Sequence, residues 1–88
     1  MYDEMREFVI GALEEMSFPT DDLADDSLLG PDDLGMDSLA FAEVIVQVEE
    51  RYDVRFGQDE AGGPTDISLA SFVERLVKSV EIAKAEAA

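Results

Sequence analysis

The sequence predicts an all-α fold, a small bundle of three principal helices with a long first loop. Apolar residues recur at helical spacing in three separate segments, a long acidic stretch follows the first of them, and no convincing pair of strands is present. With 88 residues, the chain has room for one hydrophobic core, so we expect a single domain over residues 1–88. A hydrophobic content of 47% argues for a folded chain despite the high charge.

The first helix is expected over residues 2–16, where apolar residues lie three and four positions apart on one helical face. These are Met5, Phe8, Val9, Ala12, Leu13 and Met16. Pro19 ends this helix. The acidic loop that follows, residues 17–36, is long for a small domain, so its leucines are expected to pack on the core. They are Leu23, Leu28, Leu29 and Leu34.

The second helix is expected over about residues 38–52 and the third over about 68–84, with Ser68 as the N-cap of the third. Residues 53–67 are expected to be irregular, because Gly62-Gly63-Pro64 breaks regular structure and leaves room for a short helical turn at most. Residues 85–88 are expected to form a frayed tail.

The charge is strongly acidic: 22 Asp and Glu stand against 6 Lys and Arg, a formal net charge of −16. This disfavours nucleic acid and anionic membranes and favours basic partners, with simple solubility as the alternative explanation. No apolar run approaches the roughly 18–20 residues that span a bilayer. The first residues are unlike a secretory signal. We therefore expect a cytoplasmic monomer.

The chain has no cysteine and no histidine. This composition excludes disulfides, Cys/His zinc sites and Ser-His-Asp or Cys-His nucleophilic sites. The acidic loop also fails the spacing of a calcium-binding EF-hand, because Leu23, Ala24 and Leu28 stand where oxygen ligands are needed. We predict no metal site and no enzyme activity.

The segment 38–52 carries two apolar faces when it is drawn as a helix. The face expected in the core consists of Phe41, Val44, Ile45, Val48 and Tyr52. The opposite face consists of Leu39, Ala42 and Val46, interleaved with Glu43, Glu49 and Glu50. Either the loop or the tail covers this second face, or it is a docking strip for a basic partner. Glu49 and Glu50 favour docking, because acid in the last turn opposes the helix dipole and adds no local stability.

Asp37 and Ser38 stand where the loop becomes a helix. Asp37 is a strong N-cap residue that can accept a hydrogen bond from the amide of Leu39 or Ala40. Ser38 is then the first helical residue, beside unpaired N–H groups that favour a phosphate. Chemistry alone leaves two alternatives: a capping pair, or a site of phosphate attachment.

The sequence DLGMDSL, residues 33–39, resembles the G-x-D-S-L signature of acyl carrier proteins. The stretch LAFAEVIVQVEERYDVRF that follows is similar to the recognition helix of that family and its exit. The helix order, the long loop and the acidity agree as well, so the resemblance covers nearly the whole chain. It implies an acyl-carrier-like fold and a discrete type II carrier without catalytic activity.

The resemblance also implies that Ser38 receives 4′-phosphopantetheine from coenzyme A, through a transferase that uses magnesium and recognises Asp37. The thiol of that arm then holds acyl or aminoacyl groups as thioesters. Implied partners are the phosphopantetheinyl transferase and acyltransferases, ketosynthases or adenylating enzymes with basic docking patches. The implied docking residues are Asp37, Leu39, Ala42, Glu43, Val46, Glu49 and Glu50.

Three departures from the family pattern favour a specialised pathway. Ala40 stands where many fatty-acid carriers have an acidic residue, SLLGPDDLG is longer than the usual approach to the motif, and GQDEAGGPTDIS lacks a clear third helix. We therefore expect polyketide or mixed polyketide–peptide biosynthesis of a secondary metabolite such as an antibiotic. Asp37 argues against a peptidyl carrier. The alternatives are a fatty-acid or D-alanyl carrier, or an acidic helical adaptor with no prosthetic group.

Overall fold

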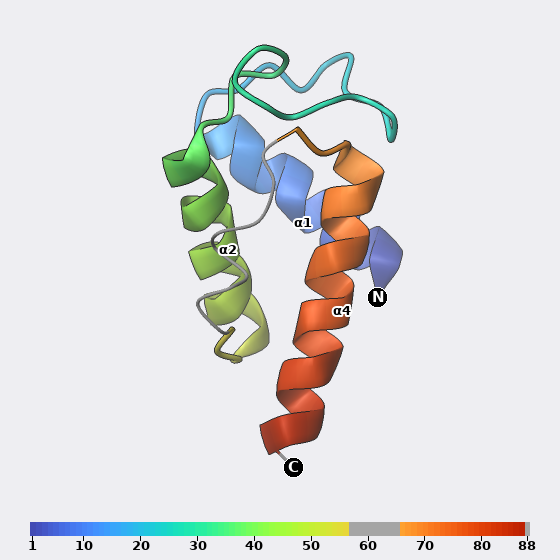
Figure 1. Cartoon of the computed structure of the whole chain (residues 1–88), viewed down its shortest axis with the longest axis vertical. Helices are drawn as coiled ribbons and strands as arrows, with labels where there is room; N and C mark the ends of the chain where they lie inside the picture. Colours follow the sequence, from blue (N-terminus) through green and yellow to red (C-terminus); the bar gives the residue numbers. More distant parts are fainter. Residues whose placement is uncertain (57–65, 88) are drawn as a thin grey trace.

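The apolar faces of three helices meet in the hydrophobic core. The structure, a computed structural model, describes residues 1–56 and 66–87. Its helices are α1 (Tyr2–Glu15), α2 (Ser38–Tyr52) and α4 (Leu69–Ala87). Helices α2 and α4 run in the same direction, and α1 crosses them obliquely (Figure 1). The loop between α1 and α2 covers the end of the bundle where α2 and α4 begin (Figure 1). The predicted all-α bundle of three principal helices is confirmed.

Each helix buries one apolar stripe, as the spacing in the sequence predicts. At the centre, the rings of Phe41 and Phe72 meet edge to face, with 5.2 Å between centroids and 88° between planes. The buried helical residues are Met5, Val9, Ala12 and Leu13 of α1, Ala40, Phe41, Val44, Ile45 and Val48 of α2, and Leu69, Phe72, Val73, Leu76 and Val80 of α4.

The loop between α1 and α2 packs on this core, but not through all four of its leucines. Leu29 is fully buried, and Leu23 and Leu34 are half-buried against the core. For Leu28 the expectation is wrong, because its side chain is 46% exposed. Leu28 forms an isolated antiparallel bridge with Ser68, and successive side chains in extended backbone point to opposite sides. Burial of Leu29 therefore directs Leu28 outward.

The helix ends lie near the expected positions, with one extension. The Ser68 hydroxyl accepts a hydrogen bond from the Ser71 amide at 3.2 Å, so Ser68 caps α4 as predicted. Helix α4 continues to Ala87, past the expected end near residue 84 and into residues expected to form a frayed tail. Alanine, lysine and glutamate in that stretch favour the helix. The short helical turn that was allowed within 53–67 falls mostly on residues 57–65, outside the described residues.

Helix α1 ends in a Schellman motif with an unusual residue. The Phe18 amide donates to the Leu13 carbonyl and the Ser17 amide to the Glu14 carbonyl, both at 3.0 Å. Ser17 has a φ of +71°, in the left-handed region that glycine normally occupies at this position. The left-handed backbone of Ser17 therefore costs a small amount of conformational free energy where α1 turns into the loop.

Replacing Ser17 with glycine should stabilise the protein by about 0.5 kcal/mol, because glycine adopts the left-handed conformation without strain. Urea unfolding followed by circular dichroism measures the change. Ser71→Gly, on the exposed side of the first turn of α4, is the matched control and should destabilise by a similar amount. Equal destabilisation by both variants would contradict the assigned cost at Ser17.

Candidate functional site

Ser38 is the first residue of α2, and the residue before it caps the helix. Asp37 has extended backbone angles, and its Oδ1 accepts a hydrogen bond from the Ala40 amide at 2.9 Å. From the sequence, either the Leu39 or the Ala40 amide could donate this hydrogen bond; in the structure the donor is Ala40. Asp37, Ser38 and Leu39 are exposed, whereas Met36 and Ala40 on either side are buried. Two buried residues therefore hold the backbone while the serine hydroxyl faces solvent.

The approach to Ser38 is a closed turn of backbone hydrogen bonds. The Gly30 carbonyl accepts from the amides of Asp33 at 3.0 Å and Gly35 at 2.9 Å, and the Met36 amide donates to the Leu29 carbonyl at 3.1 Å. Gly35 has a φ of +104°, which favours glycine. A Cβ atom there would lie 3.8 Å from the Phe18 ring, so the backbone angle rather than space requires this glycine.

The surroundings of the hydroxyl suit a phosphate ester. The first amides of a helix lack intrahelical acceptors, and the dipole places partial positive charge at this end. Side chains next to Ser38 in sequence are exposed, so no neighbouring residue there encloses its oxygen. Exposure of Ser38 and the partial positive charge of the helix end therefore fit a phosphate-linked group, and the like charge of the Asp37 carboxylate opposes them in part.

An apolar hollow of about 370 Å³ lies along α2 directly after Ser38. Leu39 is 66% exposed and Val46 is 49% exposed, so no part of the described loop or of α4 covers this face. The lining residues are Leu39, Ala42, Glu43, Val46 and Gln47. The first four were predicted as docking residues. Gln47 was missed because it is polar, although its helical spacing from Glu43 and Leu39 places it on the same face.

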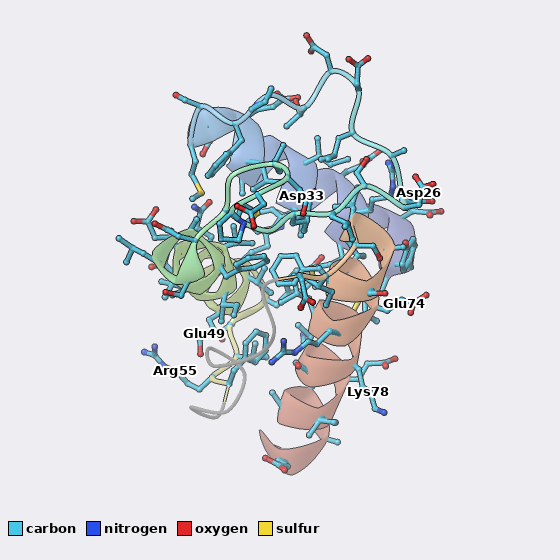
Figure 2. The ribbon with its side chains drawn as sticks, turned by 45° about the horizontal axis from the view of Figure 1, so that its top comes forward. Asp26, Asp33, Glu49, Arg55, Glu74 and Lys78 are labelled. Atoms are coloured by element: carbon cyan, nitrogen blue, oxygen red, sulfur yellow. The ribbon has the colours of Figure 1, made fainter. Side chains whose placement is uncertain are left out.

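The three remaining predicted docking residues do not line this hollow: Asp37 caps the start of α2, and the other two lie toward its end. Glu49 and Glu50 line a different hollow, between the ends of α2 and α4. The Glu49 carboxylate accepts a hydrogen bond from the Phe56 amide at 2.7 Å, so it holds the chain that leaves α2. The argument that Glu49 adds no local stability is therefore wrong. Figure 2 shows Glu49 and Arg55 on the side of the molecule away from Asp33 and the loop.

The long stretch of chain that contains Ser38 carries no basic side chain. No lysine or arginine occurs between Arg6 and Arg51. Arg6 pairs with Asp25 at 2.7 Å, which raises the pKa of the guanidinium. Arg51 lies at the far end of α2, 3.9 Å from Glu4 and over the ring of Phe8. Among the residues that line the hollow beside Ser38, the charged one is Glu43, and its negative charge favours a basic surface.

The part of the chain that the structure describes contains neither a metal-binding cluster nor a membrane-spanning helix. No group of three or more acidic side chains there is arranged to hold a metal ion. None of the described helices is long and apolar enough to cross a membrane.

Comparisons with known proteins give a consistent result. The family model described as a phosphopantetheine attachment site matches residues 7–76. An acyl carrier protein of Streptomyces coelicolor is 31% identical over 67 residues, 76% of this chain and 70% of that protein. An acyl carrier protein of Sulfurovum sp. is 31% identical over 77 residues, 86% of this chain and 97% of that protein. No solved structure matches significantly.

Replacing Asp37 with alanine should destabilise the protein by about 1 kcal/mol, because the Ala40 amide loses its acceptor. Asp37→Asn keeps a side-chain oxygen at the cap and should retain most of the stability. Urea unfolding of both variants measures the difference. An alanine variant as stable as the parent would show that the cap does not hold the start of α2.

Proposed function

Because the chain belongs to the acyl carrier protein family, we propose that Ser38 is the residue that carries its 4′-phosphopantetheine. Members of this family are non-catalytic carriers, and the arm is their covalent prosthetic group. The observation that carries the proposal is the exposure of Ser38 at the start of α2, between the buried residues Met36 and Ala40.

The attachment is a transfer of phosphopantetheine from coenzyme A by a phosphopantetheinyl transferase that uses magnesium. The Ser38 Oγ forms an ester bond to the phosphate, the pyrophosphate bond of coenzyme A breaks, and adenosine 3′,5′-bisphosphate leaves. The hydroxyl proton leaves to a base at the transferase site as the new ester bond forms. Once attached, the arm supplies a thiol that holds an acyl group as a thioester.

The chain's own residues hold the modified serine in an exposed position and form the surface that partner enzymes bind. Asp37 fixes the first turn of α2 and places a carboxylate next to the modified serine. The hollow formed by Leu39, Ala42 and Val46 offers apolar contact, and Glu43 on its rim favours a basic partner. Glu50 is exposed further along α2 and extends the acidic surface.

For the pathway, we propose a discrete carrier of polyketide or mixed polyketide–peptide biosynthesis, with acyltransferase, ketosynthase or adenylating enzymes as partners. The support is the set of sequence departures from fatty-acid carriers. One of them, Ala40, is only 7% exposed and packs in the core, where an acidic side chain would lose solvation. Fatty-acid and D-alanyl carriers are the alternatives.

Incubation with coenzyme A, magnesium and a broad-specificity phosphopantetheinyl transferase should add the mass of one phosphopantetheine to the parent. Ser38→Ala should gain nothing, because it lacks the attacking oxygen. Intact-mass spectrometry measures both. Ser71→Ala, which removes an exposed serine from the first turn of another helix, is the matched control and should be modified like the parent. A folded parent that gains no mass would favour an acidic adaptor instead.

Replacing Val46 with serine should raise the KM of the transferase for this protein about fivefold, because an apolar contact of the docking hollow is lost. Ile82→Ser is the matched control, since Ile82 is 50% exposed and Val46 49%, and Ile82 lies on α4 away from the hollow. Steady-state kinetics with varied protein concentration measures KM. The same change in both variants would contradict docking on α2.

A further inference from the structure

A second apolar hollow lies within the loop between α1 and α2. Its volume is about 370 Å³. Its apolar part is formed by Leu23, Leu28 and Leu34, and its acidic part by Asp21, Asp22 and Asp33. It shares no lining residue with the hollow on α2. The proposed docking surface on α2 therefore does not account for it.

The exposure of Leu28 is built into the fold. The Leu29 amide donates to the Ile67 carbonyl at 3.0 Å, and the Leu69 amide donates to the Ser27 carbonyl at 2.9 Å. These bonds set the register of the bridge, and the burial of Leu29 sets which side chain points inward. Leu28 cannot turn into the core without exposing Leu29. Leu28 therefore stays outward beside the half-buried Leu23 and Leu34, where the three side chains form one small apolar surface.

The carboxylates of this hollow have no compensating charge. In the same loop Asp25 pairs with Arg6, whereas the side chains of Asp21, Asp22 and Asp33 form no ion pair or hydrogen bond in the part of the chain that the structure describes. Figure 2 shows Asp33 near the middle of the view and Asp26, which comes earlier in the loop, to its right and nearer α4. Negative charge around an apolar centre selects a ligand that is apolar in the middle and positive at its edges.

We propose that this loop hollow is a second docking site, for a basic segment of a partner enzyme that inserts one apolar side chain between flanking lysines or arginines. The net charge of −16 opposes nucleic acid and anionic membranes as occupants. That the partner is an enzyme acting on the carrier's arm rests on the proposed function; the docking site itself does not. A segment bound here contacts Asp33 and Leu34, which directly precede the turn into Ser38, so the site adds selectivity close to the arm.

The probe is the peptide acetyl-Lys-Leu-Arg-Lys-amide, titrated into the ¹⁵N-labelled full chain and followed by NMR. We expect saturable shift changes centred on Leu23, Leu28 and Leu34, which weaken as salt is added. Leu28→Ser should weaken binding about tenfold, because the apolar contact is lost. Ile82→Ser removes a side chain of similar exposure and should bind the peptide like the parent.

Charge variants test the acidic part. Asp22→Asn combined with Asp33→Asn should weaken binding by several-fold, whereas Glu81→Gln combined with Glu86→Gln removes the same charge from α4 and should change it little. Absence of binding, shifts centred on Leu39 and Val46, or unsaturable shifts spread over all carboxylates would overturn the proposal. Ser38→Ala should bind the peptide unchanged, so failure of this docking site and failure of Ser38 attachment give different results.

Discussion

The presentation of Ser38 depends on Leu29. This residue is fully buried, its amide donates to the Ile67 carbonyl, and its carbonyl accepts from the Met36 amide. One loop residue therefore joins the core, the entry into α4 and the start of α2. Burial of a leucine contributes roughly 1.5–3 kcal/mol, a large share of the stability of a small domain. The burial and hydrogen bonds of Leu29 fix a long acidic loop on the core. The same contacts fix the backbone before Ser38, and the Ser38 hydroxyl remains exposed to solvent.

Charge is the second constraint on the molecule. The excess of carboxylates destabilises the compact state through mutual repulsion, and the ion pairs Arg6–Asp25 and Arg51–Glu4 offset a small part of it. The two apolar hollows, one on α2 and one in the loop, both lie in the long stretch without lysine or arginine. High negative charge thus lowers the stability of the folded state. It also speeds association with basic surfaces and repels nucleic acid.

Periodicity was enough to predict the three helices and most of the core, because helical spacing is a local property of the sequence. The cap at Asp37 and the second apolar face from Leu39 to Val46 were predictable for the same reason, whereas the sequence left open whether that face is covered, and its exposure came from the structure. Contacts between residues far apart in the sequence could not be predicted in this way. The outward position of Leu28 depends on pairing with Ser68, and the role of Glu49 depends on the chain turning back through Asp53, whose φ is +55°. Neither contact leaves a pattern in the sequence around the residue concerned.

If the buried neighbours of Ser38 make its hydroxyl the acceptor of the arm, the arm should be attached to this serine alone. The most direct measurement is to digest the modified parent protein with a protease and locate the added phosphopantetheine by tandem mass spectrometry. The group should be found on Ser38, and the peptides with Ser17, Ser27, Ser68, Ser71 and Ser79 should be unmodified. Phosphopantetheine on any other serine, with Ser38 free, would contradict it.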